Sequence, residues 1–210
     1  MRELFEQKYR ECEKSLFLVA ADMLGDSRLA QHFSDEGEIS DTQTDGKYRA
    51  AVLGVASGSE ISSFGSSAWD LYPDRTYAAV AVEKADGTDM TYDDELMISP
   101  LIEGLEPWKY NIMTMRGGYT ADIIDGVLYR IIECDSVEYF ADKTVYLAVS
   151  DTRIDGSRPY IFDEDTGRIS SDENCDGTNI LFELKLDSSK ADSEKAAEYL
   201  NKIENGDGGQ

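Results

Sequence analysis

The sequence contains a single histidine, and this scarcity excludes several kinds of catalytic site. His32 precedes the strand-rich part of the chain, so that part cannot hold a Ser–His or Cys–His nucleophilic pair. The serines of segments 57–59 and 65–67 lack the Gly-x-Ser-x-Gly elbow. No glycine-rich loop carries the lysine that cradles a phosphate. The sequence therefore predicts a protein that is not an enzyme.

Basic residues are also scarce relative to acidic ones. Lys and Arg number 20 against 43 Asp and Glu, which gives a formal net charge of −23. A charge of this sign repels phosphate backbones and anionic lipid surfaces, so we expect no nucleic acid as a partner. Hydrophobic residues still make up 41% of the 210 residues, which is enough to build a core.

Long apolar runs and a cysteine framework are missing too. Residues 16–21 form an apolar run far shorter than the ~20 residues of a membrane-spanning helix, and no secretory signal is evident. We expect no direct membrane insertion and a cytoplasmic location; the alternative is extracytoplasmic, for a fragment of a membrane protein. Cys12, Cys134 and Cys175 form neither a disulfide framework nor a zinc pattern. A Cys134–Cys175 bridge would require an oxidising compartment.

What the sequence does contain divides at about Phe33. Residues 1–33 are nearly charge-balanced and predict an amphipathic helix over 2–24, ended by Gly25. Its apolar residues recur at helical spacing, at Leu4, Phe5, Tyr9, Leu16, Val19, Ala20 and Met23. Residues 34–46 are polar without periodicity, and we expect a linker there.

From residue 47 the pattern changes to period two and short apolar runs. The expected strands are 47–55, 59–64, 76–84, 95–102, 108–115, 119–124, 127–134, 143–149, 159–162 and 179–186. Asp125-Gly126 fits a two-residue hairpin turn. Residues 189–204 predict a helix capped by Ser189 or Asp192, and residues 205–210 a flexible tail.

These elements together predict a mainly β fold. We expect an antiparallel β-sandwich, immunoglobulin-like or similar, over residues 47–204, with an N-terminal and a C-terminal helix. The sandwich is expected to fold without the first 33 residues, because its strands supply enough apolar area.

One loop matches a metal-binding template. Asp172, Asn174, Asp176, Gly177 and Glu183 satisfy the spacing of the twelve-residue calcium loop. The flanking residues read as strands and not as the helices of an EF-hand, so a hairpin turn rich in Asp, Asn and Gly is the favoured interpretation. No cofactor other than calcium is suggested.

Aromatic residues recur along the expected strands, where they usually fill the core. At one strand end the segment Arg116-Gly117-Gly118-Tyr119 predicts a binding surface made by Arg116 and Tyr119.

The N-terminal segment resembles a known family. Phe5, Tyr9, Leu16 and Ala20, with the Leu24-Gly25-Asp26 turn and Leu29-Ala30, resemble the start of region 2 of extracytoplasmic-function sigma factors. The resemblance ends at about residue 33, before the promoter-melting helices, so it implies a dimerisation or docking element and not a working sigma factor. The alternative is an ordinary amphipathic helix that packs on the β domain.

Residues 47–204 resemble the extracytoplasmic C-terminal domain of anti-sigma-factor-like membrane proteins of Gram-positive bacteria, a family of unknown function. The likeness rests on segments 99–102, 124–127, 133–135, 140–149 and 186–192. It implies an all-β, non-catalytic sensory or interaction domain that binds a protein, a peptide or an envelope component. The alternative is a calcium-dependent or carbohydrate-type binding module that uses acidic loops and exposed aromatic residues.

Overall fold

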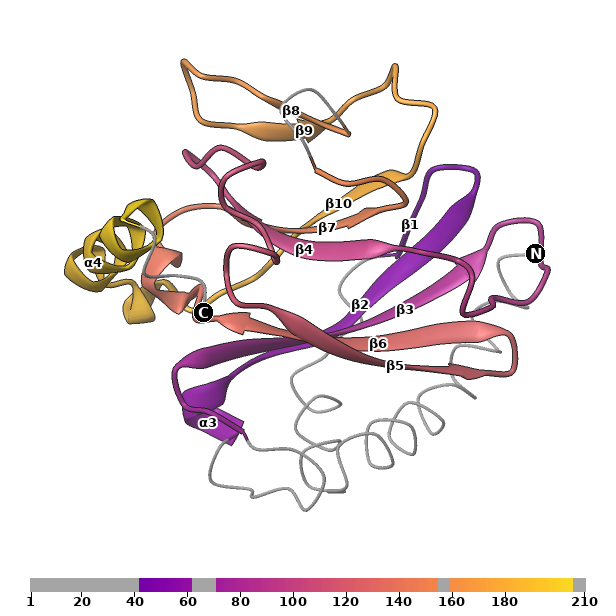
Figure 1. Ribbon diagram of the computed structural model, residues 1–210, viewed down its shortest axis with the longest axis horizontal. Coiled ribbons are helices and arrows are strands. Elements are labelled where there is room, and N and C mark those ends of the chain that lie inside the picture. The colour runs from indigo at the N-terminus through magenta and orange to yellow at the C-terminus, as the bar shows by residue number, and fades with distance from the viewer. Residues whose placement is uncertain (1–41, 62–70, 155–158, 206–210) are drawn as a thin grey trace.

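The computed structural model describes residues 42–61, 71–154 and 159–205 (Figure 1). These residues form antiparallel β-sheets and one C-terminal α-helix, which confirms a mainly β fold. The predicted N-terminal helix lies outside the described residues. Within the described residues, no helix combines the length and the apolar character needed to cross a membrane.

The larger sheet has five strands in the order β1–β2–β3–β6–β5. Their bounds are β1 (Thr42–Thr44), β2 (Tyr48–Ser57), β3 (Arg75–Lys84), β5 (Gly118–Ile124) and β6 (Val127–Asp135). The predicted hairpin turn at Asp125-Gly126 is confirmed, since both residues have positive φ angles, 51° and 80°. Two successive left-handed residues make the type I′ turn that matches the twist of paired strands.

A second sheet has the order β10–β7–β4 and lies across one face of the larger one in Figure 1. It consists of β4 (Met97–Ile102), β7 (Val145–Ser150) and β10 (Asn179–Glu183). A separate hairpin, β8 (Tyr160–Phe162) with β9 (Ile169–Ser171), packs beside it. The Gln43 side-chain amide joins β1 to β10 by donating to the Leu181 carbonyl over 2.9 Å.

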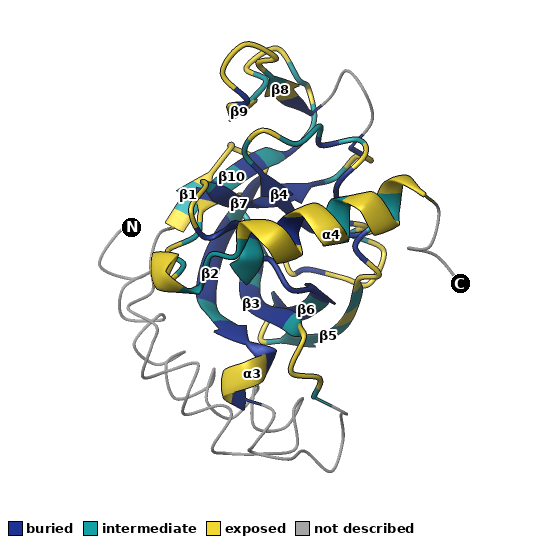
Figure 2. Cartoon of the chain, turned by 90° about the vertical axis from the view of Figure 1, so that its left-hand side faces the viewer, coloured by how far each residue is buried: buried dark blue, intermediate teal, exposed yellow. Residues whose placement is uncertain are grey.

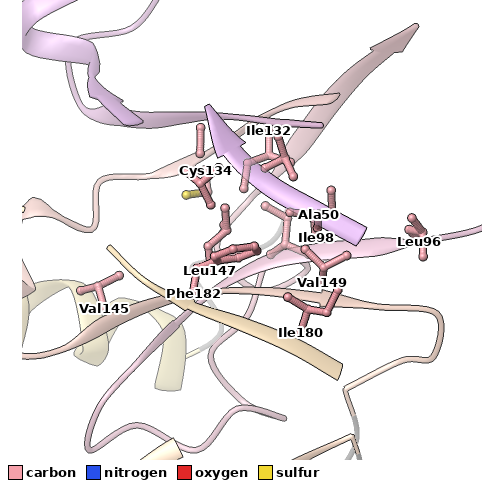
Figure 3. Packing of buried hydrophobic residues seen from close by; sticks show 14 of the residues in the cluster. Ala50, Leu96, Ile98, Ile132, Cys134, Val145, Leu147, Val149, Ile180 and Phe182 are labelled. Carbon is pink, nitrogen blue, oxygen red and sulfur yellow. The ribbon is translucent and has the colours of Figure 1, made fainter. Parts of the chain in front are cut away.

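The main core lies between these two sheets (Figure 3). Alternate side chains of β2, β3 and β6 point toward the second sheet because successive strand residues face opposite ways. Buried residues from both sheets meet there, among them Ala50, Val80, Ile132, Cys134, Ile98, Leu147, Val149, Ile180 and Phe182.

The predicted C-terminal helix forms as α4 (Ser193–Glu204). Of the two expected caps, Asp192 is the one that starts it, accepting a hydrogen bond from the Lys195 amide over 3.0 Å. Ser189 instead lies in a short 3-10 turn, η3 (Ser188–Lys190). Figure 2 shows that α4 turns an exposed face outward. Its inner side packs on η2 (Glu138–Phe140), where the Tyr199 ring meets the Phe140 ring edge-on.

Two predicted strands are wrong. Residues 59–61, the described part of the predicted strand 59–64, belong to a short helix, α3 (Gly58–Ile61). The Ser57 amide donates to the Glu60 carboxylate and the Ser57 hydroxyl accepts from the Ser59 amide, and such reciprocal bonds stabilise a helix start. Residues 108–115 form turns, because Asn111 bonds to the Pro107 carbonyl and to the Met113 amide.

Two short strands appear where the sequence predicted none. β1 occupies residues 42–44, inside the stretch 34–46 that was expected to be a linker, and β9 follows the Asp163–Gly167 turn. Each is three residues long and forms by pairing with a neighbouring strand.

Candidate functional site

The outer edge of β5 has no partner strand among the described residues. β4 carries Pro100, which lacks an N–H, and β1 is short and adjoins β10 through Gln43. β5 has seven residues and, among the described strands, pairs only with β6. A strand edge of this kind presents backbone donors and acceptors to another chain.

The hairpin turn decides which backbone groups of β5 point outward. Because a two-residue turn joins β5 to β6, Ile124 and Val127 form a hydrogen-bonded pair. Alternation then directs the N–H and C=O groups of Tyr119, Ala121 and Ile123 to the open side. The Ile123 N–H agrees with this outward direction, since it donates to the carboxylate of Asp122 over 2.8 Å and not to β6. The outward groups of Tyr119 and Ala121 have no backbone partner among the described residues and can bond to another chain.

Tyr119 presents an exposed aromatic ring at this edge, with 62% of its surface accessible. The guanidinium of Arg130, on the neighbouring strand β6, lies 4.2 Å from the ring centroid. Arg130 itself is only 7% exposed, and its Nη1 donates to the Leu96 carbonyl. Cation–π contact with a buried guanidinium therefore fixes the orientation of an exposed ring.

The charge on Arg130 is poorly compensated. No salt bridge to a carboxylate is found for it within the described residues, and its Nε is buried there without a hydrogen-bond partner. Burial lowers the pKa of Arg130, and the neighbouring Tyr119 opposes that shift.

Tyr92 adds a second exposed aromatic ring beside β5. Its side chain is 73% exposed, and its hydroxyl donates to Asp122 over 3.1 Å. This hydrogen bond raises the pKa of Tyr92. We call Tyr92, Tyr119, Ala121, Asp122 and Arg130 the β5 edge surface.

Arg116, predicted with Tyr119 as a binding residue, is engaged elsewhere. Its Nε and Nη2 donate to the Asp135 carboxylate over 3.0 and 2.6 Å, and these bonds raise the pKa of Arg116. Asp135 is buried and also lies 3.4 Å from Arg75 Nη1. Arg116 thus connects the turn that precedes β5 to the end of β6. Its backbone has a positive φ of 47°.

The sequence analysis missed Arg130, although the chain held a signal for it. The confirmed turn at Asp125-Gly126 sets a register in which Ala121 opposes Arg130 and Tyr119 opposes Ile132. Residues diagonal across a strand pair lie close enough for long side chains to touch. The pair Tyr119–Arg130 follows from that register.

The calcium-loop residues are arranged as a turn. The Asp172 carboxylate accepts the Asn174 amide over 2.9 Å, and the Asp172 carbonyl accepts the Asn179 side chain over 2.6 Å. Glu183 stands at the far end of β10, about 13 Å along the strand from Asn179. Among the described residues, no group of three or more His, Cys, Asp or Glu could hold a metal. Calcium binding stays the untested alternative to the hairpin turn that the sequence analysis favoured.

Both described cysteines have free thiols, so Cys134 and Cys175 are not bridged. Cys134 is buried in the main core, and burial raises the pKa of its thiol to about 12. A thiol of that pKa is unreactive at neutral pH.

Comparisons with protein-family models, with curated proteins and with solved structures find no match to this chain. The two family resemblances therefore stay predictions from the sequence. The functional argument rests on the β5 edge surface itself.

Proposed function

We propose that this protein is a non-catalytic interaction domain that binds an extended segment of a partner protein along β5. The observation that supports this most is an open strand edge beside an ordered, exposed Tyr119 ring. An added strand would bond to the outward N–H and C=O groups of Tyr119 and Ala121. A side chain of the added strand would pack on the Tyr119 ring.

The scaffold of the proposed domain is a β-sandwich of the two sheets around the main core. A sandwich keeps its edge strands rigid, since the residues facing inward are close-packed. Rigid edges suit peptide capture, because little backbone order has to be gained on binding.

The β5 edge favours a short contact. Further along this edge, the Asp122 carboxylate accepts hydrogen bonds from the Ile123 amide and from the Tyr92 hydroxyl. The Ile123 amide is therefore not available to an added strand. The partner strand therefore bonds chiefly opposite Tyr119 and Ala121, and Tyr92 flanks its end. We expect reversible binding.

The charge of the protein favours a cationic partner. With a net charge of −23, the chain attracts positively charged segments over distances of about a Debye length, and salt weakens that attraction. The rate of association should therefore fall as ionic strength rises.

The test uses Ala121→Pro in the full chain. The Ala121 N–H points to the open side, so proline removes a donor for the partner without breaking the ladder to β6. Extended peptides are selected from a displayed random library against the wild-type protein. Their affinities are then measured for Ala121→Pro, for Tyr119→Ser and for a control, Tyr72→Ser, whose ring is also exposed but lies before β3.

We expect binding to weaken at least tenfold in Ala121→Pro and in Tyr119→Ser and to stay unchanged in the Tyr72→Ser control. Urea unfolding of each variant checks that the fold is intact. The proposal fails if the selection returns no binder, or if the peptides bind Ala121→Pro as tightly as the wild type.

A further inference from the structure

The two faces of β5 differ in chemistry. Tyr119 is opposite Ile132, a residue of the main core, so Tyr119 and Ala121 lie on the core-facing side of the strand. Thr120 and Asp122 alternate with them and lie on the outer face. A strand added to β5 would therefore present successive side chains to two different surfaces.

The core-facing side of this edge suits an apolar or aromatic side chain. The exposed Tyr119 ring lies there, and Ala121 and Ile123 are partly buried against the main core. A partner side chain on this side removes that apolar surface from water. A basic side chain would be repelled instead, because the guanidinium of Arg130 lies 4.2 Å from the centroid of the Tyr119 ring.

The outer face of the same edge carries an oriented carboxylate. Asp122 Oδ1 accepts hydrogen bonds from the Ile123 amide over 2.8 Å and from the Tyr92 hydroxyl over 3.1 Å. Both bonds reach the same oxygen, and Asp122 Oδ2 accepts no hydrogen bond from a described residue. No described lysine or arginine forms a salt bridge with this carboxylate. Asp122 is thus held in place with one oxygen open.

Tyr92 adds a ring beside that carboxylate. The ring is 73% exposed, and its hydroxyl bond to Asp122 keeps the two groups within reach of one partner side chain. A guanidinium or ammonium group can contact an aromatic face while it donates to a carboxylate. Basic and acidic residues that are opposite or diagonal across a strand pair attract each other. The outer face therefore favours a cation, and the core-facing side does not.

We propose that the segment bound along β5 carries a lysine or arginine that pairs with Asp122, at an odd number of residues from the apolar side chain that packs on the core-facing side. The pairing rests on the proposed function and names the chemistry of its partner. Odd spacing follows because successive strand residues face opposite ways, whether the added strand is parallel or antiparallel. The basic position is one residue from the position opposite Ala121 and three from that opposite Tyr119.

The first test selects peptides from the displayed random library on the wild type and on Asp122→Asn. Asparagine keeps an acceptor for the Ile123 amide and the Tyr92 hydroxyl but carries no charge. We expect peptides selected on the wild type to carry lysine or arginine one or three residues from their apolar anchor. Selection on Asp122→Asn should keep the anchor and lose this preference. The control, Glu164→Gln, removes an equal charge from the exposed turn between β8 and β9 and should keep the preference.

The second test needs no variant of the protein for its main result. A selected peptide is synthesised with arginine, with its neutral analogue citrulline, and with the arginine moved by one residue. We expect either change to weaken binding to the wild type about three- to fivefold, as for a partly exposed ion pair. The same changes should have no effect on binding to Asp122→Asn and their full effect on binding to Glu164→Gln. High salt should reduce the difference between arginine and citrulline.

The outcomes distinguish the Asp122 pairing from the proposed function. Peptides that lose affinity for Ala121→Pro, but show no basic preference or show it at even spacing, would overturn the pairing and leave strand addition in place. An equal effect of citrulline on the wild type and on Asp122→Asn would also overturn the pairing. If no selected peptide is sensitive to Ala121→Pro, strand addition at β5 fails and the pairing fails with it. Urea unfolding of Asp122→Asn checks that its fold is intact.

Discussion

Replacing Arg130 by methionine should separate the stability of this protein from its binding. Arg130 lies on the core-facing side of β6, between Leu128 and Ile132 in the alternation of the strand. Methionine has a similar length, can follow the same path and carries no charge. The variant removes the buried Nε, the hydrogen bond to the Leu96 carbonyl and the contact with the Tyr119 ring.

The opposing free energies can be estimated from these contacts. Loss of the charged hydrogen bond to Leu96 lowers the stability of the fold by about 1.5–3 kcal/mol. Removal of an unsatisfied buried donor raises that stability by about 1–3 kcal/mol. Loss of the cation–π contact with Tyr119 costs about 0.5–2 kcal/mol. Removal of the buried charge stabilises the fold by several kcal/mol more, because Arg130 has no carboxylate partner among the described residues. We therefore expect Arg130→Met to be about 1 kcal/mol more stable than the wild type, a Tm increase of roughly 2–4 °C.

Urea unfolding of Arg130→Met, Tyr119→Ser and the double variant measures both parts of this argument. The coupling energy between the two side chains should be about 0.5–2 kcal/mol. Peptides selected against the wild type should bind Arg130→Met more weakly, because the Tyr119 ring loses its support. A destabilisation of Arg130→Met above about 2 kcal/mol would refute the estimate of the desolvation cost. A coupling of zero would show that Arg130 does not hold the ring.

Two further predictions concern the second sheet and its loops. Tyr160→Phe should lower the free energy of unfolding by about 1 kcal/mol, because the buried hydroxyl lies 3.0 Å from one carbonyl of β7 and from one of β10; a urea-unfolding change below about 0.3 kcal/mol would contradict this. Millimolar calcium should leave the Tm unchanged, whereas a site that binds a hundredfold more tightly than the dose would add about 2.7 kcal/mol. A stabilisation that Asp172→Ala and Glu183→Ala both abolish would establish the calcium site.

The long strands could be predicted from the sequence because their patterns are strong. β2, β3 and β7 contain long apolar runs, and β6 is apolar apart from Arg130, Glu133 and Asp135, since most residues of these strands are buried. The hairpin turn at Asp125-Gly126 was specified by residues that tolerate positive φ. These elements carry their own signal and do not depend on distant contacts.

The elements that the sequence did not predict depend on interactions that leave no periodic pattern of apolar residues. α3 begins because the side chains of Ser57 and Glu60 satisfy amides at its start, although its residues also suit a strand. The 108–115 segment turns because Asn111 bonds to its own backbone neighbours. β1 and β9 are short and polar, so pairing with an existing strand is what forms them.

The candidate site was predictable in part. An exposed Tyr119 at a strand end was expected from the segment around it, and the structure places it at the open edge. Its partner Arg130 requires the register of β5 on β6. Arg116 looked equally suited to binding, but its charge is directed at the buried Asp135, a long-range pairing that local sequence does not reveal.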